Sequence, residues 1–162
     1  MNTKNCLTPT KKYKKLISSV HTVYRLVNST FETKDLVCRL ARLLCQIFNA
    51  RFCAIILLDP SKKYSLFKCQ ISDGKKYTVD RKARLTDRTE KKILKTFSSV
   101  RRNGTLGVPL VCEDIMGMII IKNRRGGLSF EGFDQEILVT IAEQVTVGLR
   151  NLQLYEEQQK IV

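Results

Sequence analysis

Residues 108–156 read VPLVCEDIMGMIIIKNRRGGLSFEGFDQEILVTIAEQVTVGLRNLQLYE. The runs 105–112 and 116–122 are rich in aliphatic residues and flank the short segment 113–115, which predicts two antiparallel strands joined by a turn. From about Phe130 onward, apolar residues recur every three or four positions over about 27 residues, which predicts a helix about 40 Å long. A strand pair followed by a long amphipathic helix is typical of a mixed fold in which helices cover a sheet.

Upstream of this stretch, the same periodicities predict three helices and three more strands. Asp87 with Glu90 three residues later is a capping-box-like start for the third helix, whose apolar residues reach Val100. The predicted helices cover 13–27, 33–48 and about 87–102, and the predicted strands cover 52–58, 64–71 and 76–80. The sequence therefore predicts an α+β fold with a central antiparallel sheet of about five strands, helices packed on it, and long N- and C-terminal helices.

Both terminal helices carry more apolar residues than one buried face requires. In the first helix, Tyr13 to Val27 repeat at four- and three-residue steps, as in a heptad seam. In the last helix, a main stripe from Ile137 to Leu152 is accompanied by a thinner line on the opposite side. One face then packs on the domain, which leaves the other for a second copy of the chain. The predicted homodimer interface consists of Tyr13, Ile17, Val20, Tyr24, Val27, Val139, Val147 and Leu154.

These elements divide the chain into consecutive parts. Residues 1–12 form a basic tail that we expect to be disordered, and 13–29 form a signalling and dimerisation helix. Residues 30–152 form the globular domain, and 153–162 extend its last helix. A composition of 43% hydrophobic and 27% charged residues is typical of a soluble globular protein. No stretch approaches the roughly 20 apolar residues of a membrane span, and the N-terminus lacks the apolar segment of a secretory signal, so we expect a cytoplasmic protein.

The positive charge is concentrated in the middle of the chain. The formal net charge is +14, and residues 62–102 alone hold 14 basic and 4 acidic residues. Such a surface either serves solubility or attracts an anion, such as a small ligand or an acidic effector domain. Nucleic acid is not the expected partner, because no helix-turn-helix or zinc-finger signature is present and 81–102 contains a single aromatic residue. The candidate anion-binding residues are Arg84, Arg88, Arg101 and Arg102.

Six cysteines and one histidine are distributed over different predicted elements. Because there is no Cys-x-x-Cys pair, the sequence predicts no metal site. Most of the cysteines are expected to be small buried apolar residues. Cys38 and Cys45, seven residues apart, lie side by side on the second helix, which leaves open a redox role in which they pair with a partner protomer.

Five motifs in the C-terminal half resemble those of GAF domains in order and spacing. They are Val108-Pro109-Leu110, Gly117 to Ile121, Phe130 with Asp134, Ile141 to Gln144, and Asn151 to Glu156. The resemblance covers about residues 30–156 and implies a GAF/PAS-like fold. It also implies a non-catalytic sensory and dimerisation module of a signalling protein, such as a histidine kinase, cyclase, phosphodiesterase or transcription activator. Such a module binds a small molecule or a partner domain and transmits through its terminal helices.

The departures from the family pattern concern the ligand pocket. The connection that roofs the pocket in GAF domains is short here, since one predicted helix nearly fills 81–104, so the pocket is expected to be small, open or absent. Lys122-Asn123 reverses the Asn-Lys pair of the cyclic-nucleotide-binding subset, and Gln135 replaces its Glu. The bilin-binding subset needs a histidine and haem commonly needs one, whereas His21 lies on the N-terminal helix. The ligand is therefore unknown, and neither haem, bilin nor a metal is expected.

An enzymatic alternative exists within the same fold family. Free methionine sulfoxide reductases resemble GAF domains and use cysteine nucleophiles, with a Cys-Asp segment shortly before the Val-Pro-Leu strand and tryptophan. This chain has neither feature. No carboxylate pair or cysteine–base pair suited to catalysis is visible in the sequence, so no catalytic residue is predicted. The alternative to the sensory module is a redox-active cysteine protein, either a thiol sensor or a reductase of this kind.

Overall fold

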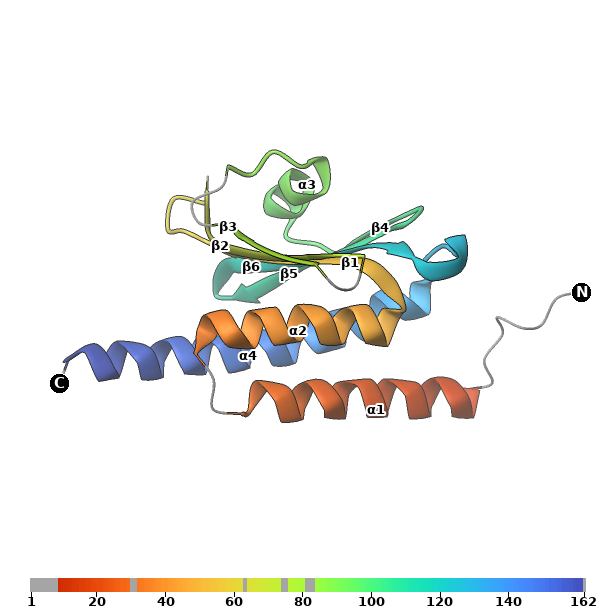
Figure 1. Cartoon of the computed structure of the whole chain (residues 1–162), viewed down its shortest axis with the longest axis horizontal. Coiled ribbons are helices and arrows are strands. Elements are labelled where there is room, and N and C mark those ends of the chain that lie inside the picture. Colours follow the sequence, from red (N-terminus) through yellow and green to blue (C-terminus); the bar gives the residue numbers. More distant parts are fainter. Residues whose placement is uncertain (1–8, 30–31, 63, 74–75, 81–83, 162) are drawn as a thin grey trace, which may run out of the picture.

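The computed structural model describes residues 9–29, 32–62, 64–73, 76–80 and 84–161, and these form helices packed on one sheet (Figure 1). The helices are α1 (Pro9–Val27), α2 (Thr33–Phe48), α3 (Arg88–Thr96) and α4 (Gly132–Ile161), with a 3-10 turn at Arg125–Gly127. The strands are β1 (Ala50–Leu58), β2 (Ser65–Ser72), β3 (Lys76–Asp80), β4 (Val100–Arg102), β5 (Thr105–Cys112) and β6 (Asp114–Arg124). All pairings are antiparallel, in the order β3-β2-β1-β6-β5-β4. The predicted α+β fold class is confirmed.

The sheet separates two apolar clusters. β1 lies between β2 and β6 and is buried on both faces, which explains the unbroken apolar run from Cys53 to Leu58. Alternate residues such as Ile55 and Leu57 belong to the cluster on the side of α2 and α4, whereas Ile56 and Leu58 belong to the cluster beneath α3. α1 lies outside α2 and α4, on their side away from the sheet (Figure 1). The larger of the two clusters therefore lies between the sheet and the helices α1, α2 and α4.

α1 and α4 run parallel to each other in the helical layers (Figure 1). Lys12 near the start of α1 lies over the ring of Phe133, 5.5 Å from its centre. At the other end of α1, Val27 meets Gly148, where an added Cβ would overlap Val27 Cγ1. The contacts advance in the same direction along both helices, which defines the parallel arrangement. Gly148 is the residue that lets the two helices approach each other.

The N-terminal boundary differs from the prediction. α1 begins at Pro9, so residues 9–12 of the expected tail are helical, and residues 1–8 lie outside the described part of the chain. Proline suits the first turn of a helix because its missing amide hydrogen would have no helical partner there. Along α1, Val20 and Val27 are half-buried against the helical cluster of their own chain. The seam predicted for a second chain is therefore divided between internal packing and solvent.

The predicted third helix is shorter than expected, and a sixth strand follows it. α3 ends before Phe97, because that residue adopts a left-handed conformation (φ 55°) and its N–H donates to Ile93 O at 2.8 Å. The side chain of Phe97, which the helical spacing directs to the core, is 46% exposed. β4 then pairs with β5 through a tight turn that contains Gly104 at φ 73°. Val100 matches the helical spacing but lies on β4, so the sequence predicted about five strands instead of six.

Candidate functional site

α3 covers the sheet face opposite the helical layers, and ion pairs hold its first turn there. Asp87 caps the helix, since its carboxylate accepts a hydrogen bond from Thr89 N at 2.7 Å and another from Lys122 Nζ at 3.0 Å. Burial alone would raise the pKa of Asp87, but the hydrogen bonds from Lys122 and from backbone N–H groups outweigh it and lower the pKa. Glu90, which is 2% exposed, lies 3.4 Å from Lys68 Nζ. Two cations of the sheet therefore fix the start of α3.

Apolar side chains pack between α3 and the sheet. A Cβ added at Gly107 of β5 would lie 2.7 Å from Ile93 Cδ1, so α3 rests directly on the backbone of that strand. The cluster on this face consists of Ile56, Leu58, Leu85, Ile93, Val100, Ile115, Met118 and Ile120. The described residues of this face pack against one another, and the two hollows described below lie elsewhere.

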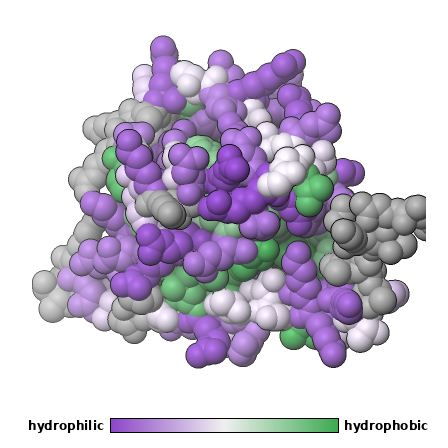
Figure 2. All heavy atoms as spheres, turned by 45° about the vertical axis from the view of Figure 1, so that its right-hand side comes forward, coloured by the Kyte–Doolittle hydropathy of each residue, from purple (hydrophilic) through white to green (hydrophobic). Residues whose placement is uncertain are grey.

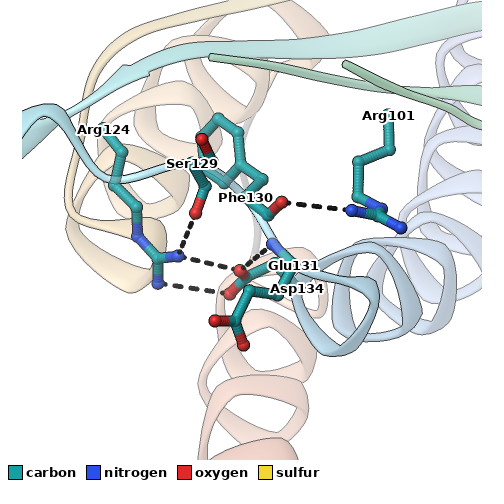
Figure 3. Close-up of polar contacts among 6 residues, drawn as sticks. All are labelled: Arg101, Arg124, Ser129, Phe130, Glu131 and Asp134. Atoms are coloured by element: carbon teal, nitrogen blue, oxygen red, sulfur yellow. Dashed lines mark hydrogen bonds and ion pairs between the residues drawn. The ribbon is translucent and has the colours of Figure 1, made fainter. Parts of the chain in front are cut away.

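The four candidate anion-binding arginines do not line one cleft. Arg84 forms an isolated antiparallel β-bridge with Tyr64, the residue before β2, and Arg88 is the first residue of α3. Arg101 and Arg102 lie on β4, at the edge of the sheet opposite β3. All four are exposed, but the guanidinium of Arg101 turns toward the start of α4, where it donates to Phe130 O at 3.3 Å (Figure 3). The fold therefore distributes these sequence neighbours over different parts of the molecule.

The charged side chains on the outward side of α3 are all cations. Arg88, Lys91, Lys92 and Lys95 are exposed, and within the described part of the chain none of them forms an ion pair. Glu90, the acidic residue of this helix, is buried on the opposite side. Clustered unpaired cations create a positive potential that attracts anionic partners. This part of the predicted positive charge is displayed on a convex helix and not in a cleft.

A buried ion pair fixes the start of α4 to the end of β6 (Figure 3). Asp134 is 4% exposed, and its carboxylate accepts hydrogen bonds from Arg124 Nη1 at 2.8 Å and Nη2 at 3.2 Å. The same carboxylate accepts from Glu131 N at 2.8 Å, while Arg124 Nη1 also donates to Ser129 O at 3.4 Å. The guanidinium lies 5.5 Å from the centre of the Phe130 ring. Both residues of the Phe-x-x-x-Asp motif therefore contact one arginine, and their role is to anchor α4.

A polar hollow of about 420 Å³ lies beside this anchor. It is lined by Arg51, Asn103, Gly104, Asn123, Arg124, Gly127, Leu128 and Ser129. Figure 2 shows this end of the molecule, whose surface is mainly hydrophilic. The exposed guanidinium of Arg51 and the neighbouring amide side chains offer hydrogen-bond donors to an anion. Sequence reasoning missed the hollow because its lining comes from separate segments, and Gly126-Gly127 in a basic turn was the available signal.

The predicted interface residues fall into two groups. The first group is exposed on α1 and α4 and consists of Tyr13, Ile17, Tyr24, Val147 and Leu154. The second group is half-buried against the helical cluster of the same chain and consists of Val20, Val27 and Val139. Part of the surface of these three residues is therefore used within the chain, and the homodimer interface stays a prediction. α1 lies close to α4, and its inward residues are used within the chain.

A second hollow, of about 370 Å³, lies between β5 and α4. Its lining consists of Phe97, Ser98, Ser99, Val108, Pro109, Val111, Val139, Ala142, Glu143 and Thr146. β4 pairs with β5 only at 105–107, so among the described strands residues 108–112 have a partner on one side alone. Pro109 has no amide hydrogen to offer at this edge, which discourages pairing with a further strand.

Neither a metal-binding cluster nor a membrane-spanning helix is found among the described residues. Within these residues, no group of three or more His, Cys, Asp or Glu side chains is arranged to hold a metal ion. No helix of the described chain combines the length and apolarity needed to cross a membrane. His21 is exposed on α1.

Comparisons with known proteins identify the fold. The sequence matches no model of a known protein family and no curated protein. Among solved structures, the GAF domains of phosphoenolpyruvate-protein phosphotransferases from Acinetobacter (14% identity, TM-score 0.70) and Coxiella burnetii (10%, 0.71) cover 88% and 89% of this chain and 97% and 98% of their own. A free methionine-R-sulfoxide reductase from Neisseria meningitidis, in complex with its substrate, is also similar (10%, 0.68) over 86% of this chain and 91% of that one. These likenesses, over nearly the full length of each structure, show that the chain has the GAF fold.

Proposed function

We propose that the chain is a non-catalytic GAF-type sensory and dimerisation module of a cytoplasmic signalling protein. The observation that carries this proposal is the parallel packing of α1 and α4, both of which present apolar side chains to solvent. Two parallel helices with outward apolar residues suit association with their symmetry copies, because four helices then bury these residues in one bundle. The GAF fold supports the proposal, since several similar structures are GAF domains of larger proteins.

The proposed dimer interface uses the outward side of α1 and the free end of α4. Ile17 and Tyr24 are 50% and 54% exposed and lie seven residues apart, close to two helical turns, on one side of α1. α4 continues past α1, because Val27 at the end of α1 meets Gly148. Leu154 is 42% exposed on this continuation. A twofold arrangement of these residues would give a continuous apolar contact along both helices.

The proposed output is a change in the position of α4. Arg124 of β6 and Arg101 of β4 both bond to the start of this helix, through Asp134 and Phe130. A ligand that moves either strand end therefore moves the anchor of α4. The helix has 30 residues. At a rise of about 1.5 Å per residue, a tilt of about 5° at its start displaces its far end by about 4 Å.

The proposed ligand is a small anion or an acidic effector domain. A small anion fits the polar hollow beside Arg51, whereas an acidic domain fits the cationic side of α3 and the exposed Arg84 and Arg102. Thermal stabilisation by a nucleotide or a polyphosphate at low salt tests the first ligand class. Arg51→Gln should abolish the stabilisation if the hollow is the site, and Arg88→Gln should abolish it if α3 is. If no such anion stabilises the wild type, the proposed anion site is contradicted, and the basic surface serves only solubility.

Light scattering of the full chain tests the proposed dimer. The double variant Ile17→Glu with Leu154→Glu should convert a dimer into a folded monomer, because a charge cannot be buried at either position without a partner. Leu66→Glu is the matched control, since this leucine is 52% exposed on β2, away from both terminal helices. A dimer that survives the double substitution, or a wild type that stays monomeric when concentrated, would contradict the proposed interface.

An enzymatic candidate is favoured by one observation, the similarity to a structure of a free methionine-R-sulfoxide reductase. The missing Cys-Asp segment and the absence of tryptophan favour the non-catalytic module over this enzyme. The test is an assay with free methionine sulfoxide and a thiol reductant. Turnover that disappears in Cys69→Ser or Cys112→Ser, and persists in Ile17→Glu, would replace the sensory module with an enzyme.

A further inference from the structure

Four of the cysteines form two facing pairs between α2 and the sheet. Cys38 and Cys45 lie on α2, and each hydrogen-bonds to a cysteine of the sheet instead of facing a second chain. Cys38 meets Cys69 of β2, and Cys45 meets Cys53 of β1. The two strand cysteines lie on adjacent strands, diagonal to each other on one face of the sheet. Cys38 and Cys45 therefore each face a free cysteine of their own chain, which corrects the hypothesis that they pair with a partner protomer.

The Cys38 and Cys69 sulfurs are close to bonding distance. Cys69 Sγ donates a hydrogen bond to Cys38 Sγ at 2.8 Å. A disulfide bond is about 2.05 Å long, so the sulfurs need to approach by less than about 1 Å. Both supporting elements are held by their neighbours in the core, Val37 on α2 and Ile71 on β2 among them. The two sulfurs are therefore positioned for cross-linking between two elements of the core.

The two sulfurs differ in accessibility and in their roles in the hydrogen bond. Cys38 is half-buried at the border of α2, whereas Cys69 is fully buried. Burial raises the pKa of Cys69, and its hydrogen bond to Cys38 acts in the same direction, while the positive charge of Lys34 acts against both. Cys69 therefore keeps its proton and directs it at the sulfur of Cys38. The accessible sulfur is the acceptor of this hydrogen bond, which favours Cys38 as the site of first attack on an oxidant.

We propose that Cys38 and Cys69 are a peroxide-sensitive dithiol that closes into an intrachain disulfide. Cys38 gives up its proton and its sulfur attacks one oxygen of hydrogen peroxide. The O–O bond breaks, and the other oxygen leaves as hydroxide and takes up that proton to become water, so that Cys38 carries a sulfenic acid. Cys69 then attacks the Cys38 sulfur, the S–O bond breaks, and this hydroxide leaves with the proton of Cys69 as a second water. Two thiols and one peroxide thus give one disulfide and two waters. A dithiol reductant restores both thiols by exchange.

The cross-link acts on the contact between α2 and the free end of α4. Thr33, the first residue of α2, donates to Glu156 from its backbone N–H at 3.0 Å and from its hydroxyl at 2.9 Å. Cys38 lies little more than one turn further along α2, so a bond from Cys38 to β2 restrains the part of α2 that holds α4. This effect reaches α4 in a monomer as well as in a dimer. It therefore goes beyond the proposed function and does not depend on it.

Trypsin separates the two thiol pairs, because each of the four cysteines lies in a different tryptic peptide. Cys38 lies in 35–39 and Cys69 in 69–75, while the buried pair lies in 43–51 and 52–62. The full chain is treated with hydrogen peroxide, its remaining thiols are alkylated, and the non-reduced digest is analysed by mass spectrometry. The expected main product is 35–39 linked to 69–75, which disappears after treatment with dithiothreitol. Links no different from those of a urea-unfolded sample, or a Cys38 that carries only sulfenic or higher acids, would overturn the proposal.

A thermal measurement provides the second test. Closing a loop of about 30 residues should raise the melting temperature of the oxidised chain by about 10 °C. Cys112→Ser, a change at an exposed cysteine of β5, is the matched control and should keep this shift. Cys69→Ser should abolish it, and Cys38→Ala at the half-buried position serves if Cys69→Ser does not fold. A peroxide-dependent shift of the same size in Cys38→Ala would contradict the assignment of the pair.

Discussion

Replacing Asp134 by asparagine removes the negative charge of the anchor between α4 and β6 with little change of shape. The carboxylate accepts hydrogen bonds from both terminal nitrogens of the Arg124 guanidinium, and the side chain of Arg124 is 17% exposed. The variant therefore leaves this cation without its counter-charge. Removal of one partner from a buried ion pair costs about 3–5 kcal/mol. Because the amide oxygen still accepts one hydrogen bond and Arg124 still reaches Ser129 O, we expect the lower end, about 3 kcal/mol. For a chain of this length, the melting temperature should fall by about 6–12 °C.

Urea unfolding followed by circular dichroism measures this loss, as a lower midpoint with an unchanged slope. Glu131→Gln is the matched control, because it makes the same chemical change three residues earlier at an exposed carboxylate, and it should cost less than about 0.5 kcal/mol. The effect of Asp134→Asn should persist at about 1 M salt, since buried charges are screened much less than exposed ones. A loss below about 1 kcal/mol, or one that Glu131→Gln equals, would refute the role of the ion pair as the anchor of α4.

Three further substitutions probe the other contacts. Gly107→Ala places a methyl 2.7 Å from a side chain of α3 and should lower stability in urea by about 1–3 kcal/mol, whereas Gly132→Ala, with open space around it, should lower it by less than about 0.5 kcal/mol. Asp87→Asn keeps a helix cap but loses a charge whose pKa in the folded state lies below its ordinary value of 3.8. The stability gap to wild type should therefore be present at pH 7 and be lost as the pH falls from 3.8 through the lower pKa of the folded state. Gly148→Ala overlaps Val27 and should detach the end of α1, seen as faster amide hydrogen exchange there with the sheet still protected; unchanged exchange in α1 would show that this approach is not needed.

Periodicity in the sequence was sufficient for most of the fold. The aliphatic run 116–122 and the repeat of apolar residues after Phe130 each reflect the geometry of a single element, and β6 and α4 follow from them. The motif of Phe130 and Asp134 also placed the start of α4 correctly. The short strand β4 could not be found in this way, because Val100 satisfies the helical spacing of α3. Its strand conformation depends on pairing with β5, a contact that no local pattern contains.

The functional surfaces depended far more on how the elements meet. Helical spacing showed that Cys38 and Cys45 share one side of α2, but their neighbours Cys69 and Cys53 come from two different strands, brought there by the register of the sheet. In the same way, the apolar seam of α1 was readable, while its division between solvent and α4 follows from a close approach at Gly148. A repeat along one helix or strand specifies which residues share a face, because backbone geometry is local. Which two faces come together is a property of long-range packing, and it exists only when the whole chain has folded.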